Sequence, residues 1–164
     1  MRQWAIFSGR FDPPNAGHFM TIEKLCCEYA GVAVIVLTTN REACSAEEAM
    51  AIFDWHFKAV LPTIAQNKVE TVLFPEHFGR ISKDDLQKLM VAMEFNKHNA
   101  VYVTGNLPVL NHIQDLDILP VRFMPRVHVN EVTDEYLFES TRVRKKMNCG
   151  ETLEDQYGID FGPR

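Results

Sequence analysis

WAIFSGRFDPPNAGH, residues 4–18, opens the organised part of the chain. Trp4 to Ser8 is an apolar run with the length of a short β-strand, and the glycine and prolines that follow cannot continue a strand. From about Gly17, apolar residues recur at three- and four-residue spacing, which predicts an amphipathic helix. The chain therefore begins with a strand, a tight loop and a helix.

The same alternation continues along the chain. VAVIVL at 32–37 is a continuous apolar run rich in β-branched residues, which is typical of a strand covered on both faces. The alternation predicts a single doubly wound, Rossmann-like α/β domain with a five-stranded, mainly parallel sheet and right-handed crossovers. This domain is expected to span 1–164, with a loosely organised C-terminal tail from about 152. The strands are expected at residues 4–8, 32–37, 69–74, 100–104 and 121–124.

Composition excludes several classes of partner. The 164 residues carry 17 Lys and Arg against 22 Asp and Glu, a net charge of −5. A protein that coats nucleic acid or an anionic membrane needs a basic surplus, so neither partner is expected. No apolar run approaches the roughly 20 residues of a membrane span. Four scattered cysteines without metal-ligand spacing fit a reducing compartment, and a cytoplasmic location is expected.

The first loop has the chemistry of a phosphate-binding turn. Gly9 lets the backbone approach a ligand closely, and Gly17 leaves the helix N-terminus uncovered. The free amides and the helix dipole there favour an anion. His18 adds a donor, Asn15 an amide and Arg10 a guanidinium group. Taken alone, a loop of this composition is more often an ordinary turn with a surface histidine.

A second polar cluster lies near the C-terminus. Ser140 and Thr141 place two hydroxyl groups at a helix start, where they can cap the first turn or reach a phosphate. Arg144 follows Thr141 by three residues and so shares its helix face. The run RVRKK alone usually marks a solvated basic helix end.

Together the two segments resemble the signatures of the nucleotidylyltransferase superfamily, G-x-F-x-P-x-[HT]-x-G-H and [IV]-S-x-T-x-[IV]-R. The resemblance is greatest to the archaeal-type nicotinamide mononucleotide adenylyltransferases. Asn15 stands where the family has His or Thr, and Ser140 replaces a glycine of the archaeal variant. The matching residues are Gly9, Phe11, Asp12, Pro13, Gly17, His18, Thr141, Val143, Arg144, Lys145, Met147, Gly150 and Glu151.

This resemblance implies adenylyl transfer from ATP to a phosphate-bearing acceptor, with nicotinamide mononucleotide favoured and NAD and pyrophosphate as products. It implies Mg²⁺ bridging the substrate phosphates; Asp12 is a candidate ligand, with formation of the turn as the alternative. The catalytic residues would be His18, Asn15, Thr141 and Arg144. The residues that contact nucleotide or phosphate would be Gly9, Arg10, Phe11, Gly17, Arg41, Gly105, Asn106 and Ser140.

The acceptor is the open part of this hypothesis. The family's stacking aromatic side chain has no counterpart, because the corresponding stretch, 83–87, reads KDDLQ. Cytidylyl transfer to glycerol 3-phosphate, adenylyl transfer to phosphopantetheine and nucleotide binding without catalysis therefore stay as alternatives. The missing R-T-x-G-I-S-T run makes the cytidylyl version less favoured. Assembly into a homo-oligomer is expected from the resemblance.

Overall fold

The computed structural model describes residues 3–60 and 68–125. Their strands form one five-stranded sheet in the order β3-β2-β1-β4-β5, with every neighbouring pair parallel. The expected α/β class and five-stranded sheet are thereby confirmed. The strands are β1 (Trp4–Gly9), β2 (Gly31–Leu37), β3 (Val69–Phe74), β4 (Ala100–Thr104) and β5 (Val121–Phe123).

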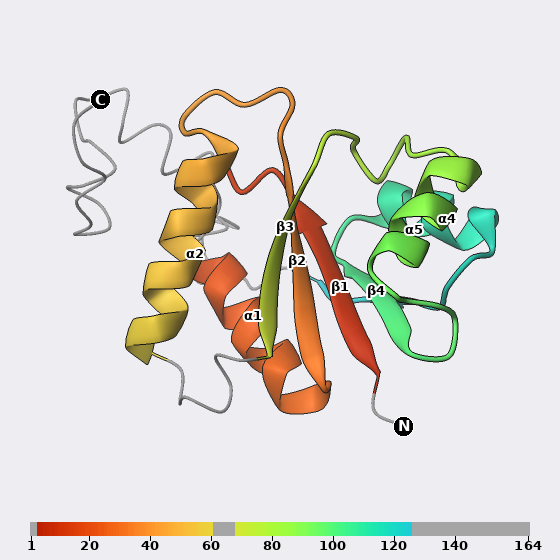
Figure 1. Cartoon of the computed structure of the whole chain (residues 1–164), viewed down its shortest axis with the longest axis horizontal. Helices are drawn as coiled ribbons and strands as arrows, with labels where there is room; N and C mark the ends of the chain where they lie inside the picture. The colour runs from red at the N-terminus through yellow and green to blue at the C-terminus, as the bar shows by residue number, and fades with distance from the viewer. Residues whose placement is uncertain (1–2, 61–67, 126–164) are drawn as a thin grey trace, which may run out of the picture.

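Helices cover both faces of the sheet (Figure 1). Helices α1 (Ala16–Glu28) and α2 (Ala46–Val60) lie on one face, and α4 (Lys83–Ala92) and α5 (Leu107–Leu116) lie on the other. Each begins at a side chain that accepts a backbone N–H of its first turn, which satisfies one of the amides a helix start leaves unpaired. These capping residues are Asn15, Ser45, Ser82 and Asn106.

Strand β2, which lies between β3 and β1, shows why the sequence adopts this layering. All seven of its residues are buried, and successive side chains point to opposite faces. Val32, Val34 and Val36 join the core beneath α1 and α2. The intervening Ala33, Ile35 and Leu37 join the core beneath α4 and α5. An uninterrupted apolar run is therefore the pattern that a strand with two buried faces requires.

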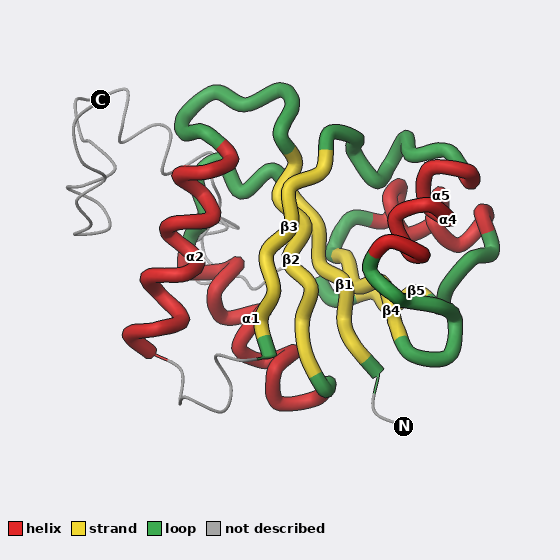
Figure 2. The backbone as a smooth tube through the Cα atoms, in the orientation of Figure 1, coloured by secondary structure: helices red, strands yellow, loops and turns green. Residues whose placement is uncertain are grey.

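The strand order also locates the candidate site. From β1 at the centre, the chain runs outward through β2 and β3 on one side and through β4 and β5 on the other. The direction of winding reverses between β1 and β4, and ligands of open α/β sheets bind at such a reversal, beyond the carboxyl ends of the strands. Figure 2 shows the loops that follow β1, β2 and β3 gathered at one edge of the sheet.

Some predictions fall outside residues 3–60 and 68–125. Ser140, Thr141 and Arg144 do, and so does the tail expected from about 152. No helix within the described ranges has the length and apolar composition that crossing a membrane requires.

Candidate functional site

The loop after β1 is shaped by a buried aromatic ring. Phe11 is 3% exposed, adopts a positive φ of 47° and meets the Phe53 ring edge-on at a centroid distance of 4.9 Å. Its ring also lies against Gly9, where a β-carbon would come within 3.1 Å of it. A side chain at this position would therefore require the Phe11 ring to shift by a few tenths of an ångström. The Phe11 side chain belongs to the core, so a ligand contact from this residue would have to use its backbone.

A reciprocal pair of hydrogen bonds starts α1. The side-chain oxygen of Asn15 accepts the His18 N–H at 3.2 Å, and His18 Nδ1 accepts the Asn15 N–H at 3.1 Å. Because Nδ1 acts as an acceptor, the proton of the neutral imidazole lies on Nε2. The ring is further fixed by an edge-on contact with Phe11, with centroids 4.8 Å apart. His18 is thus held with a donor nitrogen at the carboxyl edge of the sheet, while Asn15, 3% exposed, serves as the helix cap.

Asp12 joins this loop to the loop that follows β2. One carboxylate oxygen accepts the Glu42 N–H at 2.6 Å, and the other accepts those of Ala43 and Cys44 at 2.8 and 2.9 Å. Burial raises the pKa of Asp12, but these three N–H groups and the Arg41 charge together outweigh burial, so its pKa lies below the usual value. This geometry favours the turn-forming role of Asp12 over a metal contact.

The Arg41 guanidinium donates hydrogen bonds where the loops after β1 and β2 meet. Nε donates to the Cys44 carbonyl at 2.8 Å, and Nη1 donates to the carbonyls of Leu37, at 2.8 Å, and Arg10. Nη2 donates to the Phe11 carbonyl at 3.0 Å and to the Cys44 sulfur at 3.3 Å. A guanidinium has five N–H donors, and these bonds use all five. The Arg41 side chain is also only 8% exposed. Its burial and its fully used donors favour a positioning role over the phosphate contact expected from the sequence.

The end of β4 supplies a second turn at the site. The Asn106 N–H donates to the Thr104 hydroxyl at 3.1 Å, and the Asn106 side-chain oxygen accepts the Val109 N–H at 3.2 Å. Gly105 lies between them, half-buried. The side chains of Ser8 and Tyr102, 2.6 Å apart, link the carboxyl half of β1 to β4. The predicted residues of the first loop and of the β4 turn thus lie after neighbouring strands.

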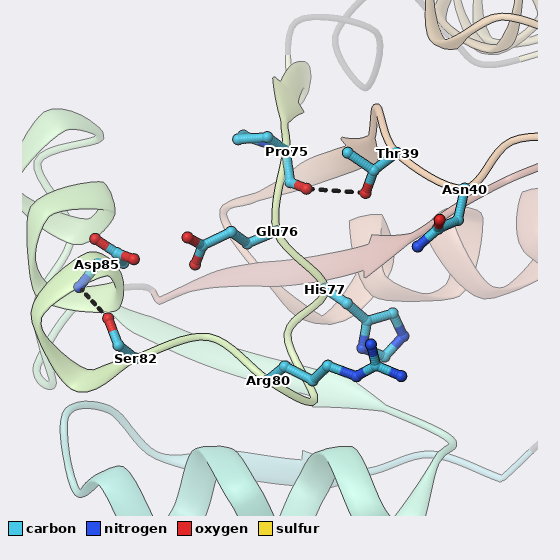
Figure 3. Close-up of a pocket in the computed structure, with 8 residues that line it drawn as sticks. All are labelled: Thr39, Asn40, Pro75, Glu76, His77, Arg80, Ser82 and Asp85. Atoms are coloured by element: carbon cyan, nitrogen blue, oxygen red, sulfur yellow. Dashed lines mark hydrogen bonds between the residues drawn. The ribbon is translucent and has the colours of Figure 1, made fainter.

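A cavity of about 320 Å³ adjoins this loop cluster, between the ends of β2 and β3 and the start of α4 (Figure 3). Its volume falls at the lower end of the range of small-molecule sites. No sequence motif marks this cavity. The signal available was its position, because the segment 75–82 directly follows a predicted parallel strand. The lining residues are Thr39, Asn40, Pro75, Glu76, His77, Arg80, Ser82 and Asp85.

One side of the cavity is basic. The His77 ring lies beside the Arg80 side chain (Figure 3), and the exposed Arg10 donates to the Asn40 carbonyl at 3.3 Å. Burial, then Arg80, then Arg10 lower the pKa of His77. Its Nδ1 accepts the Gly79 N–H at 2.9 Å, which leaves the ring proton of the neutral form on Nε2. A neutral donor that lies near two guanidinium groups suits a phosphate.

The basic side gives a first testable prediction. His77 should titrate below the ordinary histidine value of about 6.5. The substitution Arg80→Gln should raise the pKa of His77 toward that value, because it removes a nearby positive charge that disfavours the imidazolium. The chemical shift of the ring Cε1–H, followed by NMR against pH, measures both. A pKa of His77 that does not change in the variant would show that the two groups are not electrostatically coupled.

Known structures share this fold. A bifunctional NMN adenylyltransferase/ADP-ribose pyrophosphatase of Francisella tularensis, in complex with AMP and a manganese ion, matches with a TM-score of 0.67 and 16% identity over 94% of this chain. This chain spans only 44% of that protein. A Vibrio parahaemolyticus protein assigned as a nicotinate-nucleotide adenylyltransferase matches with a TM-score of 0.62 and 17% identity, over 94% of this chain and 86% of that one.

A nicotinic acid mononucleotide adenylyltransferase of Plasmodium falciparum matches with a TM-score of 0.54 and 12% identity, over 94% of this chain and 88% of its own length. No protein-family profile and no curated protein sequence matches the chain. The chain therefore has the α/β fold that these nucleotidyltransferase structures share. Within that class, the neighbours described above are adenylyltransferases of nicotinamide or nicotinate mononucleotide. The fold expected from the resemblance is confirmed, whereas the nucleotidylyltransferase superfamily and its archaeal-type branch stay predictions.

Proposed function

We propose that this protein is an adenylyltransferase that transfers the adenylyl group of ATP to a phosphate-bearing acceptor. The observation that carries the proposal is the start of α1. There, His18 is fixed as an Nε2 donor at the point where the sheet reverses its winding. The fold shared with three nicotinamide- or nicotinate-nucleotide adenylyltransferases supports this reaction class. Nicotinamide mononucleotide is the favoured acceptor.

The reaction is an in-line attack by an acceptor phosphate oxygen on the α-phosphate of ATP, with pyrophosphate as leaving group. A phosphate monoester is already anionic near neutral pH, since its second pKa is about 6, so no general base is required. The protein must position the two polyanions and stabilise the developing charge. We assign that role to His18 Nε2–H and the Gly17 amide. Thr141 and Arg144, with Ser140, would hold the leaving pyrophosphate.

A divalent cation fits this scheme as part of the substrate complex. The Francisella neighbour was solved with manganese and AMP. Among the described residues of this chain, no group of three or more His, Cys, Asp or Glu side chains could hold a metal ion. Mg²⁺ usually keeps several waters and binds substrate phosphates, and here it would neutralise phosphate charge.

The test is magnesium-dependent pyrophosphate release. ATP and CTP are each assayed with nicotinamide mononucleotide, phosphopantetheine and glycerol 3-phosphate. We expect release from ATP with nicotinamide mononucleotide, and NAD as the second product. Release from CTP with glycerol 3-phosphate would instead support cytidylyl transfer. ATP binding without release for any pair would contradict the proposed reaction and favour a nucleotide-binding protein without catalysis. Cytoplasmic location and homo-oligomeric assembly stay proposals of the same kind.

A further inference from the structure

The cavity beside the first loop separates its charges. His77 and Arg80 line the basic side, and Arg10 lies close by, where it donates to the Asn40 carbonyl and lowers the pKa of His77. On the opposite side, the carboxylates of Glu76 and Asp85 point toward one another (Figure 3). The neighbouring Asp85 side chain raises the pKa of Glu76, with smaller contributions from burial and from the Asp85 charge. A ligand that spans the cavity therefore meets cations at one end and carboxylates at the other.

Hydrogen bonds between side-chain hydroxyls and the backbone fix the segments that line the cavity. The Thr39 hydroxyl donates to the Pro75 carbonyl at 2.9 Å and so joins the loops after β2 and β3. The Ser82 hydroxyl caps α4 by accepting the Asp85 N–H at 3.1 Å, which fixes the backbone that carries the Asp85 carboxylate. The adjacent Asp84 does not line the cavity, and its Oδ2 lies 3.2 Å from Lys88 Nζ. The acidic side thus consists of Glu76 and Asp85.

We propose that this cavity selects an acceptor that is a zwitterion, with its phosphate at the Arg10–His77–Arg80 side and a cationic heteroaromatic ring at Glu76 and Asp85. This inference rests on the proposed function and makes it more specific. A nicotinamide nucleotide has both charges, because its pyridinium ring is cationic and its amide is neutral. A nicotinate nucleotide adds a carboxylate to the ring, which would lie next to two carboxylates. Repulsion between the nicotinate carboxylate and those of Glu76 and Asp85 would disfavour the nicotinate nucleotide.

The same arrangement accounts for a departure from the resembling family. The stretch 83–87, KDDLQ, has no aromatic side chain to stack on the nicotinamide ring. A cationic ring is attracted by the face of an aromatic side chain, but it is also attracted by carboxylates through direct Coulomb interaction. Glu76 and Asp85 would supply that attraction here. The neutral amide is then tolerated, and the nicotinate carboxylate is disfavoured.

The test compares two acceptors that differ in this one group. With ATP at saturation, kcat/KM is measured for nicotinamide and nicotinate mononucleotide, in the wild type and in the double variant Glu76→Gln, Asp85→Asn. We expect the wild type to prefer the nicotinamide form by about tenfold or more, which corresponds to about 1.4 kcal/mol. The variant should lose most of this preference through the KM of the acceptors. The matched control is Asp84→Asn, which removes a charge from the same helix turn outside the cavity and should leave the ratio unchanged.

Binding of each nucleotide without ATP, measured by calorimetry, separates the two proposals. Equal turnover of both nucleotides by the wild type, or a ratio that the double variant does not change, would overturn the charge selection and leave adenylyl transfer intact. Absence of turnover would contradict the proposed function. In that case, tighter binding of the nicotinamide form, lost in the double variant, would still support the zwitterion site, and failure to bind either nucleotide would overturn it.

Discussion

Replacement of His18 by alanine should lower kcat for adenylyl transfer by about 10²–10³, the range measured for loss of one preorganised donor. The structure fixes the His18 ring from two sides, through the Nδ1 acceptor bond to the Asn15 N–H and the edge contact with Phe11. The Nε2 donor is therefore aligned before substrate binds. Steady-state kinetics at saturating ATP and acceptor measure the loss.

A matched variant separates the donor role of His18 from its capping role. Alanine also removes the acceptor that completes the capping box, at a cost of about 1 kcal/mol of stability. His18→Glu keeps an acceptor for the Asn15 N–H but has no donor and adds a negative charge. We expect it to keep a Tm near that of the wild type and to be at least as inactive as His18→Ala. Activity of either variant within a few-fold of wild type would contradict the proposed role.

The sequence was sufficient for the fold class and for the approximate positions of the strands, because the apolar pattern is nearly free of conflict. A continuous apolar run rich in β-branched residues, such as 32–37, is typical of a strand buried on both faces, and β2 is buried at every position. Helix starts were readable for a similar reason. Ser45 and Glu48 have capping-box spacing, and the structure forms both bonds, at 3.0 and 3.1 Å.

The roles of individual site residues were harder to predict. Arg10 and Arg41 are both arginines close to the first loop, and the sequence gives them the same chemistry. In the structure Arg10 is exposed, whereas Arg41 lies at a junction where backbone carbonyls from three segments need donors. Which buried backbone carbonyls require a side-chain donor depends on how the loops meet in space. A local sequence pattern does not contain that information.

The cavity residues illustrate the same limit. Glu76, His77 and Arg80 form no motif, and His77 has no metal-ligand spacing. Their positions become meaningful only once β3 is known to lie next to β2, because that pairing brings the segment 75–82 beside the loop that carries Asn40. Strand order is a long-range property, and the expected alternation of strands and helices left it open.

Asp12→Ala should be strongly destabilising, by about 3–5 kcal/mol, the range for breaking a buried charge pair by removing one partner. The Asp12 carboxylate is 1% exposed and accepts three backbone N–H groups, those of Glu42, Ala43 and Cys44. Alanine leaves these donors without this acceptor, and each buried donor without a partner is costly. The Arg41 guanidinium, 3.9 Å away, also loses its neighbouring negative charge. Denaturant unfolding at pH 7 measures the change.

The pH dependence of Asp12→Asn tests the charge itself. Because folding lowers the pKa of Asp12, its ionised form stabilises the protein fully above the unfolded value of about 3.9. That contribution is lost as pH falls through the lower pKa of the folded state. The stability difference between wild type and Asp12→Asn should therefore be largest near neutral pH and shrink below about pH 4. Asp54→Asn removes the same charge from an exposed position on α2 and is the control. A difference for Asp12→Asn that stays constant from pH 7 to pH 3 would show that shape, not charge, makes Asp12 necessary.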